Sequence, residues 1–210
     1  MAPDRHTESR PVIFPKRIAV VVAVFSLLAG SAAADSTIVI LRHGEKPELG
    51  LGQLTCQGLN RALALAPVLL ARYGKPTTIY APNPAQLKKD HGVPYAYVRP
   101  LATIEPLAVR AGLPVNLQWS MTEVPEMGDA MLAAPGTYIV AWEHHWGENL
   151  ARYLLSKLGG NPLEVPQWQD DDFDSLYIVR IADGADGSRR PSFSREQEGL
   201  DGMSMVCPAH

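Results

Sequence analysis

The chain has 210 residues, a length typical of one domain with short additions. Hydrophobic residues make up 46% of the chain and charged residues 20%, which excludes a protein that is disordered throughout. The formal net charge of −3 does not support nucleic-acid binding, because proteins that bind nucleic acids usually carry a basic surface.

The first 34 residues have the pattern of an export signal. A polar segment with four basic residues over 1–17 precedes an apolar stretch over 18–28, and Ala32 and Ala34 form a small-residue cleavage site. The apolar stretch is shorter than the about 20 residues that a membrane span needs. We therefore expect a signal peptide over 1–34, an exported protein that is periplasmic or secreted, and no stable membrane insertion after cleavage. An uncleaved N-terminal anchor is the alternative.

Expected strands and helices alternate along the rest of the chain. The expected strands are 37–41, 77–80, 95–98, 114–117 at a sheet edge, 138–142 and 176–179. The expected helices are 54–73, which Pro67 kinks or divides, 101–111, 126–133 and 147–158. Loops are expected over 82–94 and over 183–202. Lys88, Lys89 and His91 in the first loop are expected to be solvated, and a loop that caps a functional site is the alternative.

This alternation predicts an α/β fold, a three-layer αβα sandwich with a mostly parallel central sheet. The domain is expected over 35–182, followed by a C-terminal tail over 183–210. Cys56 and Cys207 can pair in an oxidising compartment, which would tie the tail down and close a loop of about 150 residues. Such a bond is worth about 5 kcal/mol in the chain-entropy model. Two buried free thiols are the alternative.

Two expected strands end in a histidine within a charged cluster. Arg42 and His43 follow the first strand, and Glu143 and His144 follow the strand over 138–142. Ligands of open α/β sheets bind beyond the carboxyl ends of the strands. The two histidines are therefore candidates for one functional site.

The segment from Ile40 to Glu45, with the sequence ILRHGE, resembles the signature of the histidine phosphatase superfamily, which has the phosphoglycerate-mutase-like fold. Three later segments are similar to further family motifs and follow in the expected order: 54–62, 99–108 and 140–144. The resemblance implies an exported phosphatase that hydrolyses a phosphomonoester, or another phosphoryl compound, through a phosphohistidine intermediate on His43.

The chemistry of four residues fits this implied reaction. Arg42 and Arg99 offer forked, charged donors to phosphoryl oxygens. His43 can attack phosphorus through an unprotonated ring nitrogen, and His144 can donate to an oxygen that gains charge. Because Arg99 precedes Pro100, its backbone is expected to be extended. The partner is a small phosphorylated substrate or phosphate, with no cofactor and no metal required.

A leaving alcohol needs a general acid. The resemblance points to Glu45, which we favour, or to Glu123. Glu143 is adjacent to His144, but the alternation of a strand would turn its side chain the other way.

Two other functions remain open. The same pocket could hold a phosphorylated or other anionic ligand without turnover, because the acid motif of the family is not clear here. A metal-dependent hydrolase is the second, with the ligands His43, Glu45, Glu143, His144 and His145. The neighbouring arginines would repel a cation, which disfavours it.

Overall fold

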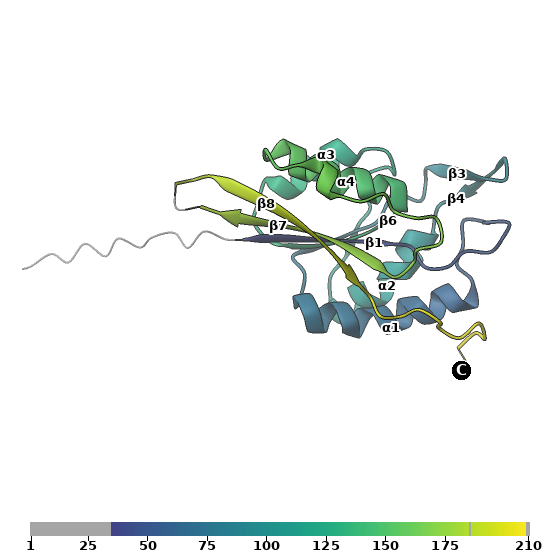
Figure 1. Ribbon diagram of the computed structural model, residues 1–210. Helices are drawn as coiled ribbons and strands as arrows, with labels where there is room; N and C mark the ends of the chain where they lie inside the picture. The colour runs from purple at the N-terminus through teal and green to yellow at the C-terminus, as the bar shows by residue number, and fades with distance from the viewer. Residues whose placement is uncertain (1–34, 185, 209–210) are drawn as a thin grey trace, which may run out of the picture. The chain divides into compact units, whose positions relative to one another are not determined.

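A six-stranded sheet forms the centre of the computed structural model, which describes residues 35–184 and 186–208 (Figure 1). The strand order is β5-β2-β6-β1-β7-β8. These strands are β1 (Ser36–Arg42), β2 (Thr78–Tyr80), β5 (Val115–Asn116), β6 (Thr137–Trp142), β7 (Ser175–Asp183) and β8 (Arg189–Gln197). Strands β5, β2, β6 and β1 pair in parallel, while β7 pairs antiparallel to β1 and to β8. The expected leader over 1–34 lies outside the described residues.

Helices cover both faces of the sheet (Figure 1). The helices α1 (Cys56–Tyr73) and α2 (Arg99–Ala111) lie on one face, and α3 (Val124–Leu132) and α4 (His144–Lys157) lie on the other. A short 3-10 helix, η1 (Pro162–Glu164), follows α4. The predicted three-layer α/β fold with a mostly parallel sheet is confirmed. Among the described helices, none is long and apolar enough to cross a membrane.

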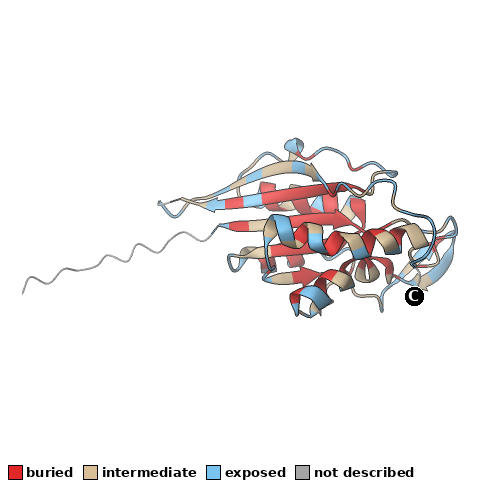
Figure 2. Cartoon of the chain, turned by 90° about the horizontal axis from the view of Figure 1, so that it is seen from below, coloured by how far each residue is buried: buried red, intermediate tan, exposed pale blue. Residues whose placement is uncertain are grey.

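Strand β1 is buried on both faces because its apolar side chains alternate between two cores. Ile38 and Ile40 pack toward α3 and α4, while Val39 and Leu41 pack toward α1 and α2. All four are at most 1% exposed, and Figure 2 shows the centre of the sheet as buried throughout. Burial of one such side chain stabilises the fold by about 1.5–3 kcal/mol. This packing fixes the residues at the end of β1.

Three local expectations about the helices differ from the structure. Pro67 lies inside α1 and does not divide it, because the residues around it pack against the sheet. Arg99 is not extended but begins α2, since Pro100 lies in the first turn, where its missing N–H costs nothing. Helix α4 begins at His144 rather than 147, because the Glu143 carboxylate accepts a hydrogen bond from Trp146 N at 3.2 Å and caps the helix.

Two expected loops contain strands instead. Residues 183–202 are not loop-like, because β8 pairs along its whole length with β7 and continues the sheet beyond residue 182. The side chains of β8 are mostly polar, so the sequence lacks the apolar run by which the other strands were predicted. Such polar side chains are typical of an edge strand with a solvated face. The expected loop over 82–94 contains β3 (Leu87–Asp90), whose hairpin partner is β4 (Val93–Ala96). His91 and Gly92 form its turn, both with positive φ.

The predicted disulfide between Cys56 and Cys207 is present. It joins the first residue of α1 to the end of the chain across a sequence separation of 151 residues. Asn60, one turn further along α1, donates to the carbonyl oxygens of Ser204 at 2.8 Å and Val206 at 2.7 Å. The C-terminal segment is therefore held against α1 by a covalent bond and by hydrogen bonds.

Candidate active site

The two histidines lie at the same edge of the sheet because β1 and β6 are parallel neighbours in register. Arg42 pairs with Trp142, so His43 and Glu143 are the next residues of the two strands. The His43 N–H donates to the Trp142 carbonyl at 3.1 Å and extends this pairing by one step. The sheet thus places the expected site residues of both strands side by side.

His43 is buried, with 2% of its surface exposed, and its ring has a defined tautomer. Its Nδ1 lies 2.8 Å from the Gly44 carbonyl oxygen, which can only accept, so Nδ1 carries the proton. Burial lowers the pKa of His43 well below its usual value, and the charges of Arg99 and Arg42 lower it further. The ring is therefore neutral, and Nε2 holds a free lone pair.

The turn after His43 packs directly on the start of α1. A Cβ atom on Gly44 would lie 2.9 Å from the Gly58 carbonyl oxygen, too close for any other residue. Gly44 N donates to Thr103 Oγ1 at 2.9 Å, which joins the turn to α2 as well. The glycine is required here by close approach, and the contact fixes the direction of the His43 backbone.

Arg42 is held over the segment that precedes β7. Its Nη1 donates to the carbonyl oxygens of Asp170 at 2.6 Å and Asp172 at 3.1 Å. Its guanidinium carbon lies 3.8 Å from the centre of the Phe173 ring. These contacts orient a guanidinium that is almost fully buried beside His43.

Arg99 begins α2 and is fully buried. Its Nη1 and Nη2 form a bidentate pair with the Asp90 carboxylate at 3.0–3.1 Å, and Nη1 also donates to the Gly50 carbonyl at 3.1 Å. Asp90, at the end of β3, accepts a further hydrogen bond from Gly52 N at 3.0 Å. The carboxylate offsets the buried charge of Arg99, and the sequence did not single it out.

His144 lies in the first turn of α4 between two carboxylates. Its Nε2 lies 2.7 Å from Asp170 Oδ1, and its Nδ1 lies 3.2 Å from Glu143 Oε1. The expectation that Glu143 turns away is wrong, because the strand ends there and the chain enters the helix. Burial alone would raise the pKa of Glu143, but His144 and Lys88 outweigh it and lower that pKa to about 2. Glu143 is therefore a carboxylate.

The two candidate acids have other partners. The Glu45 carboxylate forms a bidentate pair with Arg61, with distances of 2.8 Å to Nη2 and 3.1 Å to Nε. Glu123 Oε2 accepts from Ser120 N at 2.7 Å, just before α3, and this hydrogen bond lowers the pKa of Glu123. The choice between them as general acid stays a prediction.

Two further side chains lie close to these residues: Lys88 on β3, and Tyr97 just after β4. Lys88 Nζ lies 3.6 Å from Glu143 Oε1 and 5.0 Å from the centre of the Tyr97 ring. The Tyr97 ring in turn lies edge-on to His43, with 6.0 Å between ring centres. The segment with Lys88 thus contacts the site, as in the capping alternative, but as a strand rather than a loop; the sequence did not single out Tyr97.

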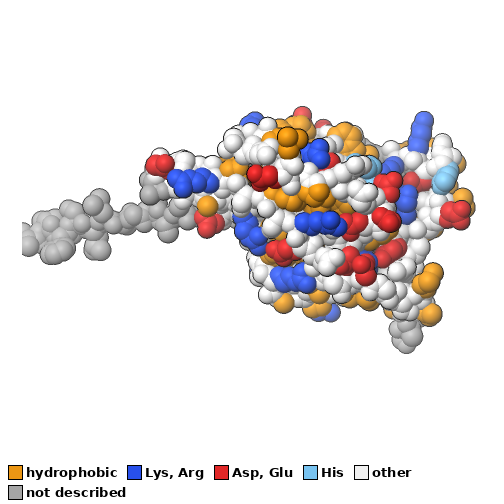
Figure 3. Space-filling view, viewed as in Figure 1, with side chains coloured by type: hydrophobic (Ala, Val, Ile, Leu, Met, Phe, Trp, Pro, Cys, Tyr) orange, Lys and Arg blue, Asp and Glu red, His pale blue; other side chains and the backbone are white. Residues whose placement is uncertain are grey.

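Charged side chains of both signs crowd this end of the molecule, close to β3 and β4 (Figure 3). Within the described chain, three buried donors around His43 lack a hydrogen-bond partner: Arg42 Nε, Arg99 Nε and Tyr97 OH. Buried donors are nearly always paired in folded proteins, so these three indicate a ligand rich in oxygen acceptors. The arrangement suits an anion next to the His43 ring.

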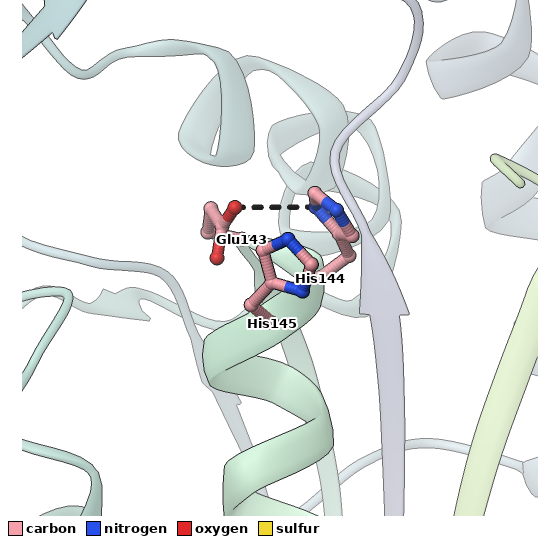
Figure 4. A group of neighbouring side chains, drawn as sticks. All are labelled: Glu143, His144 and His145. Carbon is pink, nitrogen blue, oxygen red and sulfur yellow. Dashed lines mark ion pairs between the residues drawn. The ribbon is translucent and has the colours of Figure 1, made fainter. Parts of the chain in front are cut away.

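Part of the predicted metal-ligand set is also grouped. Glu143, His144 and His145 place one ligand atom each within 4.8 Å of one another. Figure 4 shows the three side chains at the start of α4. His43 and Glu45, the other two residues of that set, are not members of this group. The cluster lies at the start of α4, beside the anion site.

No protein-family model and no curated protein matches the chain. Solved structures do resemble it. A structure named as phosphohistidine phosphatase SixA from Nakamurella multipartitia has a TM-score of 0.50 at 14% identity, covering 79% of this chain and 97% of its own. A protein histidine phosphatase SixA complexed with tungstate has a TM-score of 0.48 at 13% identity, covering 77% and 97%. A mycobacterial glucosyl-3-phosphoglycerate phosphatase with inorganic phosphate has 0.45 at 18%, covering 76% and 95%.

The structure with a TM-score of 0.50 is that of a member of the superfamily whose signature the segment from Ile40 to Glu45 resembles. At 14% identity this likeness shows a common fold and leaves the substrate open. The chain therefore has the fold of the histidine phosphatase superfamily.

Proposed function

We propose that this protein is a metal-independent phosphatase that acts on a small phosphorylated substrate through a phosphohistidine intermediate on His43. One observation carries the proposal. His43 is buried with Nδ1–H bonded to a carbonyl, and Arg42, Arg99 and Tyr97, whose charges or ring act on His43, each keep a buried donor without a partner within the described chain. A nucleophile next to unsatisfied donors is suited to attack an oxygen-rich electrophile.

The reaction has two steps. His43 Nε2 attacks phosphorus, and the bond to the leaving oxygen breaks with its electron pair, which then takes up a proton. A water molecule attacks the phosphohistidine and passes a proton to the carboxylate that gave up its proton in the first step. The P–N bond breaks, phosphate is released, and Nε2 regains its lone pair. Arg42, Arg99 and His144 stabilise the phosphoryl oxygens in both steps.

The leaving oxygen needs a proton in the first step. Glu45 or Glu123 would supply it, and the Glu45 carboxylate is bound by Arg61. A leaving group that departs readily as an anion would need no such acid.

We also propose that the protein is exported, to the periplasm or outside the cell. The disulfide between Cys56 and Cys207 supports this, because structural disulfides persist in oxidising compartments. The pattern of the first 34 residues points the same way.

The test is turnover of an aryl phosphate by the purified protein in the presence of a chelator. Wild type and His91→Ala should be active, whereas His43→Ala should not; His91 is an exposed histidine on the hairpin turn and serves as the matched control. A rapid-quench experiment with labelled substrate should trap acid-labile phosphohistidine in the wild type alone. Phosphate binding without turnover would replace this proposal with the binding module, and loss of turnover on chelation would favour the metal-dependent hydrolase.

A further inference from the structure

The start of α4 brings together a second set of groups whose chemistry differs from that of the anion site. Glu143, His144 and His145 are consecutive and still converge, because Glu143 caps the helix while the two histidines form its first turn. The imidazole rings of the histidines lie 4.0 Å apart between centres. Figure 4 shows the three side chains facing a common space.

The hydrogen bonding of His144 leaves one of its two ring nitrogens without a partner. Asp170 Oδ1 lies 2.7 Å from Nε2 and can only accept, so Nε2 donates to it. Nδ1 lies 3.2 Å from Glu143 Oε1 and is buried without a hydrogen-bond partner in the described part of the chain. Nδ1 and Oε1 are therefore free to bind a common ligand.

The spacing of Nδ1 and Oε1 suits a metal ion. Ligand atoms at 2.0–2.2 Å from a tetrahedral zinc ion lie about 3.3 Å from one another. The Nδ1 and Oε1 atoms are already at 3.2 Å. The Asp170 carboxylate behind Nε2–H completes the arrangement in which a carboxylate orients a metal-bound histidine.

The third proposed ligand, His145, lies on the solvent side of the cluster. His145 is 52% exposed, and its Nε2 lies 3.5 Å from the same Asp170 oxygen. Both residues line an open hollow of about 420 Å³. An ion could enter from this side while His43 stays covered.

The positive charges near this cluster are offset by carboxylates and do not prevent a cation from binding. Lys88 Nζ lies 3.6 Å from Glu143 Oε1, and the Arg42 guanidinium donates to the backbone of Asp170. The carboxylates of Glu143 and Asp170 offset these two cations. Two imidazoles and a carboxylate select Zn²⁺ or a similar transition ion over Mg²⁺ and Ca²⁺, which prefer all-oxygen ligands.

We propose that Glu143, His144 and His145 form a binding site for a divalent transition-metal ion of the zinc type, and that its occupation inhibits the phosphatase. Binding through Nδ1 holds His144 on the metal and removes it from the phosphoryl oxygens. The inhibitory part rests on the proposed function, whereas the binding part does not.

The binding experiment uses Zn²⁺ and equilibrium dialysis with the purified, chelator-treated protein, and Co²⁺ absorption as an optical probe of ligand geometry. We expect one Zn²⁺ per chain, unaffected by excess Mg²⁺. His145→Ala should weaken binding tenfold or more, and His91→Ala should leave it unchanged. Binding that is absent, or equal in wild type and His145→Ala, overturns the proposal.

The inhibition experiment titrates Zn²⁺ into the aryl phosphatase assay. His145→Ala should keep the basal rate, since this residue has no part in the proposed phosphoryl transfer, and should need at least tenfold more Zn²⁺ for half inhibition. Zinc that binds at one site without inhibiting overturns the inhibitory part. A protein that binds Zn²⁺ but hydrolyses no phosphate contradicts the proposed function and leaves the metal site standing.

Discussion

Arg61 Nη1 lies 2.8 Å from a carboxylate oxygen of Glu198, and at most 1% of either side chain is exposed. The same guanidinium contacts three further carboxylates, those of Glu45, Asp174 and Asp201. One cation in α1 thus links three parts of the chain: the turn after β1, which holds Glu45; the residue before β7, Asp174; and the segment after β8, which holds Glu198 and Asp201. The same ionic cluster therefore holds in place both the turn next to His43 and the C-terminal segment.

Removing this cation should be costly for the fold. Arg61→Ala leaves the Asp174 carboxylate, whose side chain is 7% exposed, without its cation, and loss of one member of a buried ion pair destabilises a protein by about 3–5 kcal/mol. Urea unfolding followed by circular dichroism measures the change. Arg180→Ala is the control, because its pair with Glu196 is exposed and worth at most about 1 kcal/mol. Equal losses in the two variants would contradict a central role for Arg61.

The same cluster should make stability depend on pH. Burial raises the pKa of Glu198 to about 8, and the carboxylates of Asp174 and Glu45 oppose the Arg61 charge that would lower it. The carboxyl of a glutamate in the unfolded chain has a pKa of about 4.3. A carboxyl whose pKa is higher than this in the folded state stabilises the fold, and the contribution is complete at pH values below about 4.3. This contribution is lost as the pH rises toward 8.

Glu198→Gln should therefore remove this contribution to the pH dependence of stability, because glutamine cannot ionise. We expect the free energy of unfolding of the wild type, relative to this variant, to fall between pH 5 and pH 8. The difference between the two proteins cancels the opposite effect of His43, whose lowered pKa reduces stability at acid pH. A difference that is constant with pH would show that Glu198 is ionised throughout.

Lys88 should contribute to binding of the phosphoryl group. Burial lowers its pKa, and its ammonium lies near both Glu143 and the Tyr97 ring. Lys88→Ala should raise KM for an aryl phosphate about tenfold, equivalent to about 1.4 kcal/mol, with a smaller effect on kcat. Lys89→Ala is a matched control, since the next residue of β3 is exposed. Equal KM values in both variants would remove Lys88 from the site.

The sequence could predict those parts of the site that local pattern determines. An apolar run ending at Arg42 and another ending at Trp142 indicated two buried strands, and parallel pairing then brings their ends together. The two cysteines allowed a single pairing, which the structure confirms. These predictions needed no knowledge of side-chain packing.

The remaining parts depend on contacts between distant segments. Asp90 neutralises Arg99 only because a hairpin folds over α2, and Asp170 meets His144 across 26 residues. Strand β8 was missed because its side chains are polar, and its position follows from pairing with β7. Glu45 matched a family motif by position, but its partner Arg61 becomes visible only when α1 packs on the sheet.

The role of Glu45 can be separated from its structural contacts by varying the leaving group. If Glu45 supplies the proton, Glu45→Gln should slow aryl phosphates more as the pKa of the leaving phenol rises. Its bidentate pair with Arg61 leads us to expect a loss of activity that is the same for all phenols, together with lower stability. Glu123→Gln serves as the comparison, since that side chain is exposed and caps a turn. The measurement is kcat/KM across a series of aryl phosphates at one pH. A loss that grows with phenol pKa in Glu45→Gln alone would identify Glu45 as the acid and would require the Arg61 pair to open during turnover.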